Sequence, residues 1–67
     1  MTYKAARKLK VGEKVTYRGI VFTVDQVSEI HLLSGSLLQI TLSRGEDVLQ
    51  CFTPDLLEHI PDMKPIT

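Results

Sequence analysis

Apolar and polar side chains alternate in short runs along the chain, and turns that contain glycine separate the runs. In residues 14–18, Val15 and Tyr17 point to one face of an extended segment, and the polar residues point to the other, which predicts a strand. Residues 20–30 follow Gly19 and are rich in β-branched side chains, which favour a second strand. The two runs and the short turn between them predict a tight β-hairpin.

The second run changes its alternation near Asp25-Gln26. Ile20, Phe22 and Val24 share one face, but the next apolar residues, Val27 and then Ile30, do not keep the same parity. A β-bulge near Asp25-Gln26 restores an inward direction for the later residues and bends the strand. Because small sheets curl into barrels through such bends, the pattern favours a closed sheet.

Two further strands are expected. Residues 37–43 show the most regular alternation of the chain, with Leu38, Ile40 and Leu42 on one face. A short loop that contains glycine leads into a fourth strand at residues 47–53. This last run has apolar residues of both parities, so the pattern does not define which of its faces is buried.

A short helical turn is expected after the fourth strand. Thr53 suits the N-cap position, and Pro54 suits the first helical position, where the missing proline N–H costs nothing. Pro61 ends the turn. We therefore expect Leu56, Leu57 and Ile60 to cover one end of the barrel.

These elements define an all-β fold class, a small antiparallel barrel of four to five strands with a short C-terminal helical turn. Residues 9–19 (LKVGEKVTYRG), followed by residues 22–24 (FTV), resemble the opening of two groups of SH3-like small barrels. One group is the KOW-type domains, including the amino-terminal barrel of elongation factor P, and the other is small uncharacterised bacterial or phage barrels. The resemblance extends over roughly residues 9–52 and implies an SH3-like barrel.

In the elongation-factor barrels a basic loop after the second strand presents a modified lysine. Residues 31–36 here hold no Lys or Arg, so that activity is not implied.

The expected organisation is one domain. Residues 1–8 form a flexible basic arm, residues 9–61 a single SH3-like barrel, and residues 62–67 a tail. A chain of 67 residues buries only about 60% of its unfolded surface, so its stability surplus is small. Its single cysteine cannot form an intramolecular disulfide. A well-registered sheet or self-association must therefore supply the stability.

Cysteine usage and hydropathy bear on the cellular compartment. The chain has one cysteine and no charged-then-apolar leader, and no apolar run approaches the roughly 20 residues that span a bilayer. We expect a cytoplasmic protein without membrane contact.

The formal net charge is zero, but the charges are unevenly distributed. Residues 1–22 carry a net charge of +5, and residues 23–67 carry −5. Such a separation can steer an acidic partner to the basic end. In a closed fold the two halves can also neutralise each other, so the distribution alone does not decide between a binding surface and an ordinary solvated one.

No combination of residues points to catalysis or to a metal site. Cys51 and His59 are interpreted as a small buried hydrophobe and an exposed histidine rather than as a nucleophile and its base. With His31 they also fall short of a four-ligand zinc set. Ser34-Gly35-Ser36 lacks the lysine and the following helix of a phosphate-binding loop. We expect a protein that is not an enzyme and needs no cofactor.

Two binding hypotheses remain. The first is a protein-interaction or assembly module, because leucines lie where a solvated loop is normally polar. Its candidate contact residues are Leu32, Leu33, Leu37 and Leu57. An extra layer of the core would explain the same leucines. A homo-oligomer through the fourth strand or the apolar loop also stays open.

The second hypothesis is a surface for RNA or DNA, which the resemblance to KOW-type domains implies. The candidate residues are Lys4, Arg7, Lys8, Lys10, Lys14 and Arg18. Net neutrality and the lack of spare aromatic side chains for base stacking count against it, because Tyr17, Phe22 and Phe52 are expected to fill the core. We therefore expect a protein partner first and nucleic acid second.

Overall fold

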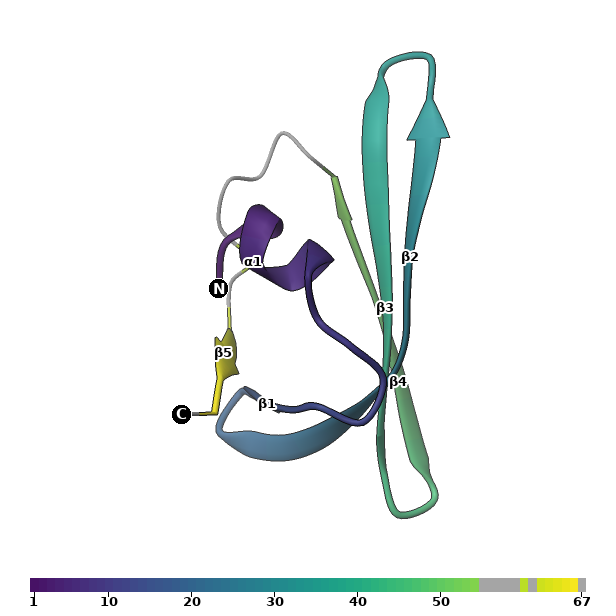
Figure 1. Cartoon of the computed structure of the whole chain (residues 1–67). Coiled ribbons are helices and arrows are strands. Elements are labelled where there is room, and N and C mark those ends of the chain that lie inside the picture. The colour runs from purple at the N-terminus through teal and green to yellow at the C-terminus, as the bar shows by residue number, and fades with distance from the viewer. Residues whose placement is uncertain (55–59, 61, 67) are drawn as a thin grey trace.

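A computed structural model describes residues 1–54, 60 and 62–66, and most of these residues lie in strands (Figure 1). A single antiparallel sheet has the strand order β4-β3-β2-β1-β5. Helix α1 (Tyr3–Arg7) precedes β1 (Lys14–Tyr17), β2 (Ile20–Leu32), β3 (Gly35–Arg44), β4 (Asp47–Pro54) and β5 (Met63–Pro65). The mostly β, antiparallel architecture agrees with the sequence. Among the described residues, β4 and β5 are the two ends of the sheet and do not pair with each other, so the sheet is open.

The β1–β2 hairpin is confirmed at the expected position. Tyr17 is paired with Ile20, and the two residues between them, Arg18 and Gly19, have φ angles of 52° and 80°. Positive φ at both central positions defines a type I′ turn, whose twist matches that of the flanking strands. The unusual backbone of Arg18 is held by Asp62, since the Arg18 N–H donates to the Asp62 carbonyl at 2.9 Å. The two side chains also form an ion pair at 3.5 Å.

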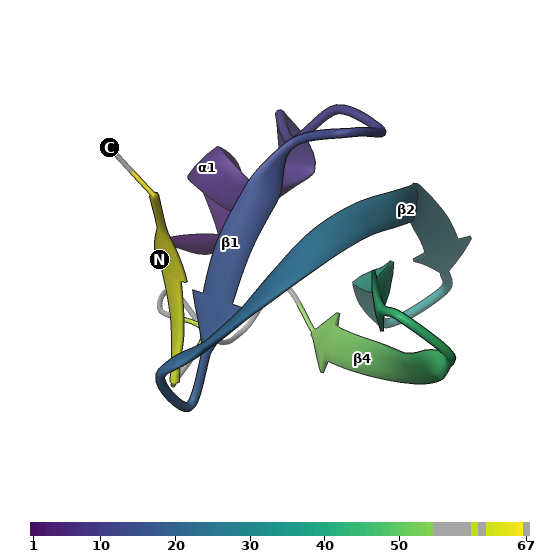
Figure 2. The same ribbon diagram turned by 90° about the horizontal axis from the view of Figure 1, so that it is seen from below.

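The expected bulge in β2 is also confirmed. Val24 is opposite Leu42, but Gln26 rather than Asp25 is opposite Thr41, so Asp25 is the extra residue. Before the bulge β2 pairs with β1, and beyond it β2 pairs with β3 alone. Figure 2 shows β2 crossing from the β1–β5 side of the molecule to the β3–β4 side.

The core lies on one face of this bent sheet. Val15, Val24, Leu38, Ile40 and Leu42 have no exposed surface. The three β3 residues are those whose alternation predicted the strand, and each is separated from the next by a half-buried polar residue. The core face of β3 was therefore correctly predicted.

Residues 1–8 form α1 and its caps, although we expected a flexible arm there. The Thr2 hydroxyl accepts a hydrogen bond from the Ala5 N–H at 3.1 Å, which caps the helix. Ala6 is fully buried against the sheet, and Tyr3 packs against the edge of the core. A single small apolar residue gives almost no periodic signal, so the sequence pattern did not indicate this packing.

The C-terminal region also differs from expectation. Thr53 and Pro54 do not begin a helix, because both belong to β4, where Thr53 is buried opposite Leu38. The other residues of the expected helical turn, 55–59, lie outside the described residues. The expected tail instead contains β5, which pairs with β1 and places Met63 in the core.

Candidate protein-contact surface

The β2–β3 hairpin extends beyond the rest of the sheet and gives the molecule a long dimension of 36 Å (Figure 1). Its last ladder pair is Leu32 and Gly35, so Leu33 and Ser34 form the tip. Gly35 has a φ angle of 138°, a conformation that side chains disfavour. A tight two-residue loop therefore holds Leu33 at the outermost point, where its side chain is fully exposed.

One face of this hairpin is apolar. Ile30 lies directly opposite Leu37, and Leu37 lies directly opposite Pro54. Residues opposite each other in a ladder share a face, as do residues two apart on one strand. Leu32 and Phe52 therefore point to the same side as Leu37. This is the side opposite to the core, because Leu38 faces inward.

We define the hairpin apolar face as these side chains together with the tip: Ile30, Leu32, Leu33, Leu37 and Phe52. Phe52 is 55% exposed, Leu32 54% and Ile30 39%, whereas Leu37 is half-buried. Three of its members, Leu32, Leu33 and Leu37, are residues that the sequence indicated as protein contacts. None of the three belongs to the buried core. The fourth, Leu57, lies outside the described residues.

The sequence pattern directed Ile30 inward after the bulge and assigned Phe52 to the core. Both assignments are wrong. Ile30 is exposed on the face opposite to the core, and Phe52 turns outward between Cys51 and Thr53, the β4 residues that turn inward. Gln50 has the same parity as Phe52 and is exposed. The polar Gln50 in the middle of β4 was the sequence signal that this parity, and with it Phe52, faces solvent.

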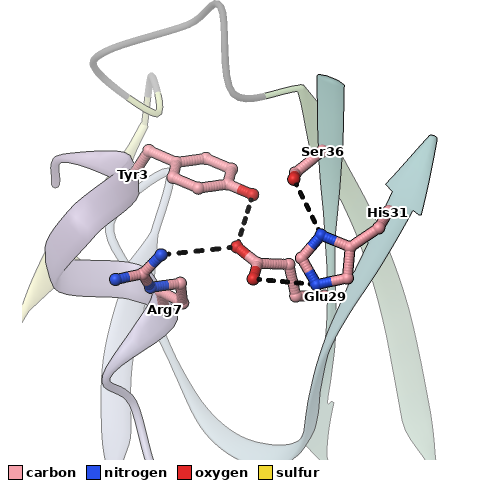
Figure 3. A network of polar contacts seen from close by, with 5 residues as sticks. All are labelled: Tyr3, Arg7, Glu29, His31 and Ser36. Atoms are coloured by element: carbon pink, nitrogen blue, oxygen red, sulfur yellow. Dashed lines mark hydrogen bonds and ion pairs between the residues drawn. The ribbon is translucent and has the colours of Figure 1, made fainter. Parts of the chain in front are cut away.

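A polar network occupies the opposite face of the hairpin (Figure 3). The Tyr3 hydroxyl donates to a Glu29 carboxylate oxygen at 3.1 Å, and Arg7 Nη1 lies 3.7 Å from the same oxygen. The other Glu29 oxygen lies 3.5 Å from His31 Nε2, a pair that is ionic only when His31 is protonated. His31 Nδ1 lies 3.2 Å from the Ser36 hydroxyl. Helix α1 is therefore joined to both strands of the hairpin.

A serine hydroxyl, an imidazole and a carboxylate that contact one another in this order also occur in acyl-transfer triads. That chemistry requires an enclosed site with donors for the developing oxyanion. The His31 side chain here is 75% exposed, and Glu29 holds the helix through Tyr3 and Arg7 as well as contacting the ring. The arrangement supports a structural role for the network.

The basic residues indicated by the sequence are divided between different parts of the molecule. Arg7 contacts Glu29, and Arg18 contacts Asp62 and lies over the Tyr17 ring, 5.4 Å from its centroid. Lys14 lies on the face of β1 opposite to that of buried Val15. Lys4 is on α1, Lys8 is its C-cap, and Lys10 is in the following loop.

An open groove of about 310 Å³ runs beside β4. Its walls come from residues 49–53 of β4 and from Tyr17 and Ile60. Cys51 lines the groove, and partial burial raises the pKa of its thiol by disfavouring the charged thiolate. The thiol is therefore a poor nucleophile at neutral pH.

The part of the chain that the structure describes holds neither a metal-binding cluster nor a membrane-spanning helix. No three metal-binding side chains there lie close enough to hold an ion. The described segments also contain no helix with the length and hydropathy to cross a bilayer. No protein-family model, curated protein or solved structure matches this chain.

Proposed function

We propose that this chain is a non-catalytic protein-binding module of the SH3-like small-barrel type, and that it contacts its partner through the hairpin apolar face. The observation that carries the proposal is the exposure of Leu32 and Leu33 at the end of a projecting hairpin, with Phe52 of the neighbouring strand β4 exposed on the same face as Leu32. Grouped apolar side chains on a domain surface mark interaction sites more often than single ones do.

The placement of these side chains supports a role in binding rather than in folding. Leu33 contributes nothing to the core, and a polar residue at a hairpin tip would cost no stability. The strands behind the tip are held on their other face by Glu29 and His31, which restrict the movement of the hairpin. A rigid apolar projection loses little conformational entropy when it enters a groove on a partner.

The barrel type is supported by the path of β2. A long strand that pairs with β1 before a bulge and with β3 after it brings both ends of the sheet round toward each other. The groove lined by Tyr17, Ile60 and β4 lies at the remaining opening. We interpret the fold as a partly open member of this class.

Site-specific photo-cross-linking tests the proposal. A photoreactive amino acid at position 33 should label a protein partner in cells. The same group at position 11 is the control, because Val11 is 72% exposed but lies in the loop before β1, where Gly12 bonds to Val24 and not to the hairpin tip. Equal labelling from both positions, or labelling of nucleic acid alone, would contradict the proposal.

Binding of the identified partner then provides the quantitative test. Replacing Leu32 and Leu33 together by serine should weaken binding at least tenfold for each leucine that becomes buried, since burial of such a side chain contributes about 1.5–3 kcal/mol. Val11→Ser should leave the affinity unchanged. An affinity that falls steeply with salt and responds to Lys8→Ala and Lys10→Ala instead would favour the nucleic-acid hypothesis.

A further inference from the structure

The two edges of the sheet differ in how well they are protected from pairing with another strand. Edge strand β5 has three residues, two of which are Lys64 and Pro65. Charged residues and proline are the usual means by which an edge avoids association. Edge strand β4 has eight residues and no charge after Asp47. The stretch from Val48 to Thr53 holds no charged residue and no proline that would discourage a second strand.

The β3–β4 turn determines which backbone groups of β4 face outward. Arg44 and Asp47 close a two-residue loop in which Gly45 has a φ angle of 62°. In such hairpins the closing pair exchanges both backbone hydrogen bonds, and bonded and non-bonded pairs alternate from there. The N–H and C=O groups of Leu49 and Cys51 therefore point toward β3.

The backbone groups of Val48, Gln50 and Phe52 consequently point toward the free edge. Pro54 has the same parity, and a proline in a sheet is tolerated where its missing N–H would face away from the neighbouring strand. The position of Pro54 thus agrees with the assignment from the turn. The residues with free backbone groups are also those whose side chains are exposed.

We propose that two copies of this chain pair through their β4 edges, antiparallel, about a two-fold axis that passes beside Gln50. Each Gln50 then lies opposite the Gln50 of the other copy, and each Val48 lies opposite a Phe52. Every free N–H and C=O of these residues gains a partner. Aromatic and β-branched side chains are a favourable cross-strand combination.

The sequence of β4 selects this register over its neighbours. A two-residue shift in one direction places Pro54 opposite Val48, where the proline ring replaces a hydrogen-bond donor. The opposite shift brings the loop residue Glu46 against Phe52, beyond the end of the strand. In the proposed register Asp47 of each copy lies opposite Thr53 of the other, so the two Asp47 side chains of the dimer stay apart. The strand is complementary to itself only when Gln50 is central.

This pairing shares Phe52 with the hairpin apolar face but does not involve Leu32 or Leu33. Leu32 and Leu33 lie on the hairpin tip between β2 and β3, away from the β4 edge, and remain free in the dimer. A protein that dimerises and binds no partner would leave the pairing intact. A monomer that binds a partner through Leu33 would remove the pairing alone.

Charge substitutions at the axis test the register. Sedimentation equilibrium of the unmodified chain should show a dimer at high micromolar concentration. Gln50→Lys and Gln50→Glu should each weaken the homodimer about threefold to fivefold at low salt, because like charges then face each other across the axis. Mixing the two variants should restore association at least to the level of the original chain.

Gln39→Lys is the matched control, because Gln39 lies on the same face but on the inner strand β3, opposite Phe52. It should leave the dimer unchanged. Hydrogen exchange gives a second reading: the amides of Val48, Gln50 and Phe52 should become protected as concentration rises, and those of Leu49 and Cys51 should be protected throughout. A monomer at all concentrations, or a mixture no tighter than either variant alone, would overturn the proposal.

Discussion

The Tyr3 hydroxyl donates a hydrogen bond of 3.1 Å to Glu29, and this contact joins helix α1 to the second half of the longest strand, β2. The Glu29 side chain is only 22% exposed, and Arg7 approaches the same carboxylate from the next turn of α1. A helix of five residues is too short to be stable by itself. Its position therefore depends on this carboxylate and on the burial of Ala6.

Glu29→Ala should lower the free energy of unfolding by about 1–2 kcal/mol, because it removes a hydrogen bond to a charged acceptor and an ion pair that is partly exposed to water. Glu46→Ala removes an equivalent charge from the exposed β3–β4 loop and should change stability by less than about 0.5 kcal/mol. Urea unfolding of the two variants measures the difference. Equal effects would show that Glu29 does not anchor the helix.

The contrast between two leucines tests the division into core and contact surface. Leu38 has no exposed area, and Leu38→Ala should cost about 2–5 kcal/mol. A domain of this size has a total stability of roughly 3–5 kcal/mol, so the variant should be largely unfolded at 25 °C. Leu33→Ala should fold normally with an unchanged unfolding midpoint. Far-UV circular dichroism during thermal unfolding distinguishes the outcomes, and a strongly destabilised Leu33→Ala would place that residue in the core.

The thiol of Cys51 should make stability depend on pH in the alkaline range. Because burial raises its pKa in the folded state, the unfolded chain loses the thiol proton at a lower pH than the folded chain does. The contribution is complete below the ordinary thiol pKa of about 8.5 and is lost as pH rises through the higher folded value. Cys51→Ala lacks this contribution. The stability difference between the two proteins, measured from pH 7 to pH 10, should therefore change in favour of Cys51→Ala as pH rises, and a constant difference would contradict burial of the thiol.

Deletion of Asp25 tests the bulge. Removing the extra residue leaves Val24 opposite Leu42 and Gln26 opposite Thr41 in a regular ladder, so the later β2 residues keep their faces and only the local bend is lost. The variant should stay folded but unfold at a lower urea concentration, because the bend that brings the two parts of the sheet over one core is reduced. Insertion of one glycine between Leu33 and Ser34 should leave stability nearly unchanged, because the tip makes no ladder pair. Urea unfolding compares the two changes, and an unchanged midpoint for the deletion would show that the bulge does not contribute to packing.

Much of the sheet could be predicted because its alternation is local. The β1–β2 turn, the bulge at Asp25 and the inward face of β3 each depend on side-chain parity over a few residues, and each agrees with the structure. The open form of the sheet could not be derived in this way, since closure depends on how far the bends accumulate over the whole chain.

The errors share a different physical cause. Helix α1 is held by Ala6 and by polar contacts to Glu29, neither of which produces an amphipathic pattern. Pro54 suited a helix start equally well as an edge strand, and only the pairing of Thr53 with Leu38 decides between them. Candidate contact leucines could be found because exposed apolar residues at a turn are unusual in themselves. Ile30 and Phe52 could be assigned to the same surface only from the strand pairing, which places them on the same face as Leu37.

The pairing of β1 with β5 determines the order in which a nascent chain can assemble. Strands β1 to β4 follow one another through short hairpins, so each can pair soon after it leaves the ribosome. The contact between Thr16 and Lys64 joins residues 48 positions apart, so it forms only after Lys64 has left the ribosome. Until then the outer side of β1 has no neighbouring strand, and Met63 cannot yet enter the core beside Tyr17. Before β5 is available, we therefore expect chaperones and proteases to act mainly on β1, although β1 is the first strand to be made.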